Sequence, residues 1–209
     1  MRLLGFSDSA FKRDDEDNTG HAMRGCVIML ATASGPDVMN SGKVQVLDYV
    51  SRKQKHVCRA TFAAELFAAV DTADMLIMLN GVMYELQHGV QTTERMRKLR
   101  EEGGYFLPSW LLIDAESVFS AIAANPIKTP AERSLLIQLQ WLKELLERGI
   151  ISRVVWCDTR DMVADALTKG SISRDALHSI CAGMLSIVRK YKCFPLHVGV
   201  RAQHALPEA

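Results

Sequence analysis

The chain carries little net charge and few cysteines, and both shortages narrow the classes of function open to it. Lys and Arg number 25 against 24 Asp and Glu in 209 residues, so the formal net charge is +1. This balance excludes a protein that binds nucleic acid through a strongly positive overall field, so any such affinity must come from local basic patches. The five cysteines are odd in number and form no C-x-x-C pair, which indicates neither a disulfide framework nor a zinc site.

Long hydrophobic runs, repeats and low-complexity segments are also missing. No apolar stretch approaches the length of about 20 residues that a transmembrane helix needs, and the apolar part of residues 1–8 is too short for a signal peptide. We therefore expect a soluble, intracellular protein, cytoplasmic or nuclear, that does not enter a membrane. With 48% hydrophobic residues the chain can bury a sizeable core, and we expect a single domain over residues 1–209.

What the sequence does contain is four carboxylates in apolar surroundings. Asp8 and Asp114 each end a short apolar run that is typical of a buried strand. Glu65 lies beside an apolar stripe with helical spacing, so its side chain should point toward the sheet. Asp165 follows the strand-like run 150–156. A single Asp after a strand is more often a turn or cap residue, but four acids in this arrangement favour a shared site.

Gathered carboxylates repel one another, so a partly buried cluster normally needs cations to stay ionised. Oxygen ligands suit hard divalent ions, and Mg²⁺ binds through a few carboxylates, waters and substrate phosphates. Two ions roughly 3.5 to 4 Å apart could activate a water and stabilise the leaving oxygen in phosphodiester cleavage. We therefore predict two Mg²⁺ ions, for which Mn²⁺ could substitute, held by all four acids.

Five segments around these acids carry a family resemblance, in this order along the chain: Gly5-Phe-Ser-Asp-Ser-Ala-Phe11, Val50-Ser-Arg-Lys-Gln54, Arg59-Ala-Thr-Phe-Ala-Ala-Glu65, Leu111-Leu-Ile-Asp-Ala-Glu-Ser-Val118 and Val163-Ala-Asp-Ala-Leu-Thr-Lys169. Each resembles a motif of the ribonuclease H domain of copia-type LTR retrotransposons, and the ordered set is more specific than any one of them. The resemblance implies an endonuclease that cuts the RNA strand of RNA/DNA hybrids. It further implies that Asp8 bridges both ions and that Asp165 completes the site of the ion on the side of the attacking water.

Substrate contacts are expected close to the acids in sequence. Basic residues between the third strand and the helix of Glu65 could hold phosphates, although a solvated basic turn is an equal alternative. We expect hybrid shape and 2′-hydroxyls to be recognised, rather than base sequence. A reverse transcriptase domain of the same polyprotein is a possible partner, because this chain holds no polymerase motif. The residues predicted to contact substrate are Ser9, Arg52, Lys53, Gln54, Arg59 and Thr61.

The sequence also departs from the family and leaves alternatives open. Ala115 and Glu116 replace an Asn and a Gln that follow the third acid in the family, and residues 90–107 look like an insertion. A catalytically weakened scaffold that binds nucleic acid or protein is therefore the main alternative. Exonuclease and transposase versions of the fold rank lower, because Asp8 lacks the Asp-x-Glu pattern of the former and the helical Glu65 comes too early for the latter.

The expected fold is α/β, a ribonuclease-H-like, five-stranded mixed sheet in the order βββαβαβα with helices on its faces. Strands two and three are predicted at 22–32 and 43–51, and a long helix at 61–88. Pro130 fits the first turn of the next long helix. A closing helix from about residue 174, followed by a tail, is predicted for 173–209, because its apolar residues recur at helical spacing.

Overall fold

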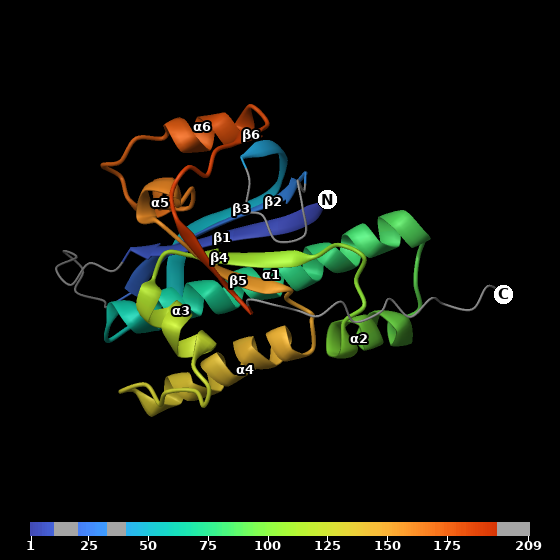
Figure 1. The fold of residues 1–209 in the computed structure, drawn as a ribbon, viewed down its shortest axis with the longest axis horizontal. Helices are drawn as coiled ribbons and strands as arrows, with labels where there is room; N and C mark the ends of the chain where they lie inside the picture. Colours follow the sequence, from blue (N-terminus) through green and yellow to red (C-terminus); the bar gives the residue numbers. More distant parts are fainter. Residues whose placement is uncertain (11–20, 33–40, 196–209) are drawn as a thin grey trace.

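The computed structural model describes residues 1–10, 21–32 and 41–195, and its centre is a mixed sheet with helices on both faces (Figure 1). Residues 196–209 of the predicted tail lie outside the described part. The strands are β1 (Arg2–Ala10), β2 (His21–Ala31), β3 (Gly42–Val57), β4 (Ser109–Ile113), β5 (Arg153–Cys157), β6 (Met184–Leu185) and β7 (Tyr191–Phe194). The helices are α1 (Thr61–His88), α2 (Thr93–Glu102), α3 (Glu116–Ala123), α4 (Leu136–Glu147), α5 (Asp165–Thr168) and α6 (Asp175–Cys181), with the 3-10 turns η1 (Arg133–Leu135) and η2 (Thr159–Asp161).

The sheet order is β6-β3-β2-β1-β4-β5-β7. β1, β2 and β3 form an antiparallel meander, whereas β1, β4 and β5 run parallel. Parallel strands need crossover connections, and α1 makes one between β3 and β4 while α3 and α4 lie between β4 and β5. The predicted mixed sheet with flanking helices is therefore confirmed.

Side chains of the central strands alternate between two apolar clusters, one on each face of the sheet. Leu3 of β1 packs with α1, α3 and α4, whereas Leu4 and Phe6 pack with the segment around α5 and α6. β4 divides in the same way, since Leu111 joins the first cluster and Leu112 the second. The central strands are therefore covered on both faces, which explains why their sequences are almost continuously apolar.

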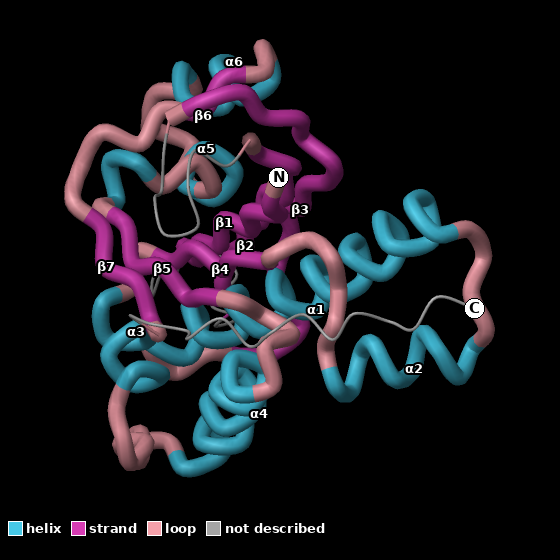
Figure 2. The backbone as a smooth tube through the Cα atoms, turned by 45° about the vertical axis from the view of Figure 1, so that its right-hand side comes forward, coloured by secondary structure: helices cyan, strands magenta, loops and turns pink. Residues whose placement is uncertain are grey.

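The long helix α1 follows the predicted bounds and runs without interruption through Asn80 and Gly81. Its contact with β1 is close, because a Cβ on Gly5 would lie 2.8 Å from Leu76 Cδ1. In Figure 2 the C-terminal half of α1 extends beyond the sheet beside α2. Within the described residues, we find no helix that combines the length and the apolar character required to cross a bilayer.

The predicted insertion 90–107 contains α2, which packs against α1. Arg95 donates a hydrogen bond to the Tyr84 hydroxyl at 3.0 Å, and Leu99 is buried. Charges on its outer surface form ion pairs, Arg97 with Glu101 at 2.7 Å and Arg100 with Asp74 of α1 at 3.9 Å. This part of the chain is therefore a solvated helix docked on α1.

The prediction of five strands is wrong, because the sheet has seven in the described residues. The two additional strands lie where a closing helix was expected. α6 ends at Cys181, and Gly183 has φ +87°, a left-handed conformation that ends the helix. β6 then pairs with the start of β3, and β7 pairs with β5. Met184 and Val188, two of the apolar residues whose helical spacing suggested a longer closing helix, are 49% and 70% exposed.

Two boundaries also differ from the predictions. β3 continues to Val57, so Arg52 and Lys53 lie in a strand rather than in a basic turn after it. Pro130 precedes η1 and α4 and is not part of either helix. The apolar side chains Leu139 and Leu142 of α4 are buried.

Candidate metal centre

Two of the four acids lie side by side because the strands that carry them are parallel neighbours. The register of β1 and β4 pairs Ser7 with Ile113, and the next residues are Asp8 and Asp114. Asp8 is 1% exposed and Asp114 is half-buried. The indole N–H of Trp156 on β5 donates to the backbone carbonyl of Asp114 at 2.8 Å, which holds this strand end in place.

The third acid, Glu65, comes from the second turn of α1. A buried side chain, Gln54 of β3, links this turn to the sheet: its amide donates to the carbonyl of Ala64 at 2.7 Å and to the Ser9 hydroxyl at 3.2 Å. Ser9 follows Asp8 directly on β1. Gln54 therefore ties the helix that carries Glu65 to the strand that carries Asp8.

Asp8, Glu65 and Asp114 form a group that could hold a cation. Each offers a carboxylate oxygen, and these oxygens all lie within 4.8 Å of one another. A second observation also points to a ligand: the buried Oδ1 of Asp8 has no hydrogen-bond partner among the described residues. An all-oxygen donor set with a buried carboxylate oxygen that accepts no hydrogen bond suits a hard divalent cation.

The fourth acid reaches the site because α5 packs directly on the sheet. Gly25 of β2 is the register partner of Asp8, and a Cβ at Gly25 would lie 2.7 Å from Thr168 Cγ2 and 2.9 Å from the Ala164 carbonyl oxygen. Only glycine permits this approach without a shift of α5. Asp165, the first residue of α5, is 6% exposed as a result.

Two residues that the sequence prediction did not assign to the site complete it. Thr168 donates a short hydrogen bond to Oδ2 of Asp8. The Lys169 ammonium lies 2.6 Å from Asp165 Oδ1 and 3.5 Å from Asp8 Oδ1. The spacing of Asp165 and Lys169, four residues apart across a short helix, is a signal that could have indicated this ion pair.

When no cation is bound, the surroundings of Glu65, Asp114 and Asp165 favour their protonated forms. Burial raises the pKa of Glu65 to about 9, and the charges of Asp8 and Asp114 add to this effect while Lys169 opposes it. Burial and the charge of Asp8 also raise the pKa of Asp114. For Asp165, burial raises the pKa to about 7, against the hydrogen bond from Lys169. A bound divalent cation would reverse these shifts.

The neighbouring acids favour the charged form of Lys169, whereas they disfavour the charged forms of one another. Burial alone would lower the pKa of its ammonium, but the hydrogen bond to Asp165 and the charge of Asp8 outweigh burial and raise that pKa above its usual value. The side chain is 34% exposed and keeps its positive charge. The site therefore contains one internal cation.

The residues predicted to contact substrate divide into two sets. Ser9 and Gln54 are each 4% exposed and bond inside the protein, where the Ser9 hydroxyl donates to the Met23 carbonyl at 3.0 Å. The structure thus gives them a place in the interior that supports the site. The other four predicted residues, Arg52, Lys53, Arg59 and Thr61, are exposed.

A further acid near the site has a structural role. Asp161 is 7% exposed and accepts hydrogen bonds from the backbone N–H groups of Val188 and Arg189 and from the Arg189 guanidinium at 2.6 Å. These bonds fasten the segment before β7 to η2, close in sequence to Asp165. Asp161 therefore holds the C-terminal strands against the part of the chain that leads into α5.

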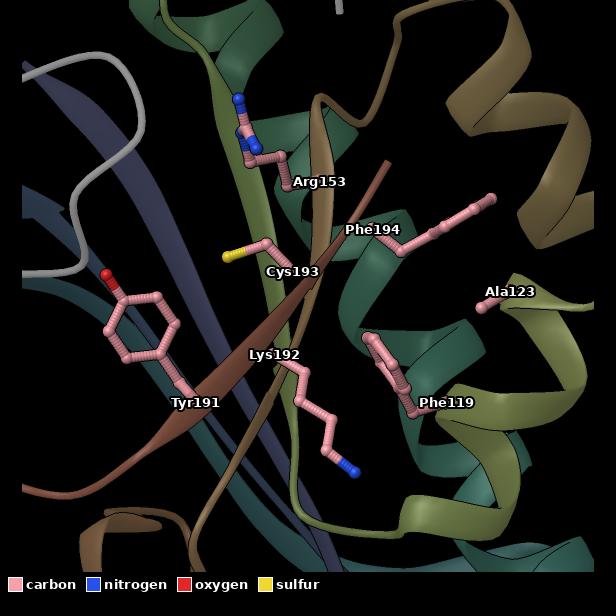
Figure 3. A pocket seen from close by; sticks show the side chains of 7 residues that line it. All are labelled: Phe119, Ala123, Arg153, Tyr191, Lys192, Cys193 and Phe194. Carbon is pink, nitrogen blue, oxygen red and sulfur yellow. The ribbon is translucent and has the colours of Figure 1, made fainter. Parts of the chain in front are cut away.

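A pocket of about 720 Å³ lies between α3 and β7 (Figure 3). Phe119 of α3 and Phe194 of β7 line it, and none of the four acids does. Lys192, another lining residue, forms an ion pair with Glu116. The pocket is therefore separate from the carboxylate cluster.

Comparisons of this chain with protein-family models, with curated protein sequences and with solved structures found no match.

Proposed function

We propose that this chain is a divalent-cation-dependent endonuclease that cleaves the RNA strand of RNA/DNA hybrids. The observation that carries the proposal is the convergence of Asp8, Glu65 and Asp114, from three separate elements, around one buried carboxylate oxygen that accepts no hydrogen bond from the described residues. Asp165 lies beside them, bonded to Lys169, which also contacts Asp8. The ordered motifs that resemble the ribonuclease H domain of copia-type retrotransposons support the choice of substrate.

The arrangement of the central strands is in keeping with this proposal. β3-β2-β1-β4-β5 follow one another in the sheet, and the chain passes through three strands, a long helix, a strand, helices, a strand and a short helix. This agrees with the predicted order βββαβαβα, apart from the inserted α2, a second helix between β4 and β5, and the added α6, β6 and β7. A ribonuclease-H-like fold is therefore part of the proposal.

In the proposed reaction the acids divide the work of holding cations. Asp8, Glu65 and Asp114 would hold one ion, and Asp8 and Asp165 the second. Bound divalent ions would supply an activated water and stabilise the leaving oxygen. Glu65, whose pKa is raised to about 9 when no cation is bound, must release its proton for this purpose. Cleavage should therefore increase with pH across the neutral range.

Around the acids, the exposed Arg52, Lys53 and Arg59 would contact phosphates of the hybrid, mainly to position it. Their charges are local, which fits a chain whose overall charge is only +1. A reverse transcriptase domain as a partner stays a prediction.

One observation favours a second candidate, a scaffold that binds nucleic acid or protein without cutting it. The Lys169 ammonium contacts Asp165 and Asp8 and so compensates part of the negative charge without a metal ion. A site that is neutralised internally could persist after catalysis is lost. The two candidates differ in metal binding and in cleavage.

The deciding experiment incubates the purified chain with labelled RNA/DNA hybrid, double-stranded RNA, double-stranded DNA and single-stranded RNA, in Mg²⁺, Mn²⁺ or EDTA. The nuclease proposal predicts cleavage of the RNA strand of the hybrid alone, dependent on the cation and lost in Asp8→Asn. Hybrid binding without products under every condition would support the scaffold. Cleavage that persists in EDTA would contradict the metal assignment.

A further inference from the structure

A lysine side chain lies within the carboxylate cluster itself. The Lys169 ammonium is 2.6 Å from Asp165 Oδ1 and 3.5 Å from Asp8 Oδ1. The Asp8 oxygen that it faces is the buried one without a hydrogen-bond partner among the described residues, while the other oxygen of Asp8 accepts the Thr168 hydroxyl. The lysine thus connects two acids that come from distant parts of the sequence.

The four acids consequently define two candidate cation positions that share Asp8. The oxygens of Asp8, Glu65 and Asp114 converge within 4.8 Å, and Asp165 is not a member of that set among the described residues. A second ion would need Asp8 and Asp165 as ligands, and both of these contact Lys169. The first cation position therefore shares one ligand, Asp8, with the lysine, whereas both ligands of the second position contact a positive charge that the chain itself supplies.

An ammonium and a divalent ion cannot share this position. Both use the same carboxylate lone pairs, and their like charges repel each other at short range. The lysine can leave, because its side chain is 34% exposed and has a flexible four-carbon stem. The next residue, Gly170, is exposed, and a Cβ added there would have no neighbour within 4 Å.

We propose that Lys169 is a built-in competitor of the second metal ion, which binds to Asp8 and Asp165 only when the ammonium withdraws. The inference rests on the proposed two-ion function. It predicts that the first ion, only one of whose ligands contacts the lysine, binds more tightly, and that the second binds at least about tenfold more weakly. Lys169 would thereby set the cation concentration at which the site becomes complete.

The test measures Mn²⁺ binding to the full chain without nucleic acid, by calorimetry and by electron paramagnetic resonance of free Mn²⁺. Lys169→Met keeps the aliphatic stem and removes the charge, and Lys169→Gln is a second variant should the first fold poorly. Lys192→Met is the matched control, because it removes an equal charge from a lysine that pairs with Glu116 and not with any of the four acids.

We expect wild type to bind one ion tightly and a second weakly, and Lys169→Met or Lys169→Gln to tighten the second ion about tenfold. Lys192→Met should leave both dissociation constants unchanged. The inference would be overturned if the Lys169 variants gave the same binding isotherms as wild type, or if wild type bound two ions with equal affinity. Neither result would contradict the proposed metal centre. Absence of Mn²⁺ binding in wild type would overturn the proposed function as well.

Discussion

Substitution of Glu65 by Gln separates the cost of gathering negative charge from the benefit of binding a cation. Gln has the shape of a protonated Glu but cannot ionise, and it is a weaker cation ligand. Burial and the neighbouring acids raise the pKa of Glu65 in the metal-free protein from its usual 4.5 to about 9. The folded state therefore binds a proton more tightly than the unfolded state does.

The sign of the pH dependence follows from this difference. The stability that the protonated Glu65 contributes is fully present below pH 4.5 and is lost as the pH rises toward 9. At about 1.4 kcal/mol per pH unit, one group can change the free energy of unfolding by at most about 6 kcal/mol over that window. Because Glu65 is only half-buried, solvent screening reduces the expected change to about 2 kcal/mol.

Urea unfolding in EDTA at pH 5, 7 and 8.5 measures this effect. We expect wild type and Glu65→Gln to have equal free energies of unfolding at pH 5, and the variant to be more stable by about 2 kcal/mol at pH 8.5. Saturating Mg²⁺ should reverse the order, because a ligand that binds only the folded state stabilises it. Parallel pH profiles for the two proteins, with or without Mg²⁺, would refute the reasoning.

Three further substitutions test how the site is supported. Gly25→Ala should displace α5, abolish hybrid cleavage and lower the free energy of unfolding in urea by about 1–3 kcal/mol. The first Mn²⁺ ion should still bind, and cleavage at the wild-type rate would contradict the packing argument. Asp161→Asn should lower the free energy of unfolding by about 1.5–3 kcal/mol. The control Asp158→Asn, which weakens an ion pair at the surface, should leave the unfolding midpoint close to that of wild type. Gln54→Leu should weaken Mn²⁺ binding, because the Ala64 carbonyl loses its bond to β3; unchanged affinity would mean that the link does not position Glu65.

The sequence predicted the elements whose hydrophobic pattern is regular. The apolar runs before Asp8 and Asp114 are strands, and the helical spacing around Glu65 predicted the full extent of α1. The site followed from the same patterns, since three of the four predicted acids converge and Asp165 lies beside them through Lys169. Local periodicity was sufficient because these elements are long and buried.

The C-terminal part could not be predicted in this way. The apolar spacing of residues 177–188 also suits a short helix followed by strands, and the left-handed Gly183 decides between them. β6 and β7 are short and depend on distant partners, β3 and β5. The interior roles of Ser9 and Gln54 likewise depend on a contact between β3 and α1 that sequence spacing does not encode.

The most direct test of the central claim is single-turnover cleavage of a labelled RNA/DNA hybrid by wild type and Asp114→Asn in Mg²⁺. Glu116→Gln is the matched control, since Glu116 is an exposed acid two residues away that pairs with Lys192. We predict that wild type and Glu116→Gln cut the RNA strand, and that Asp114→Asn is folded but cuts at least about a thousandfold more slowly. Cleavage by Asp114→Asn at the wild-type rate would contradict the account.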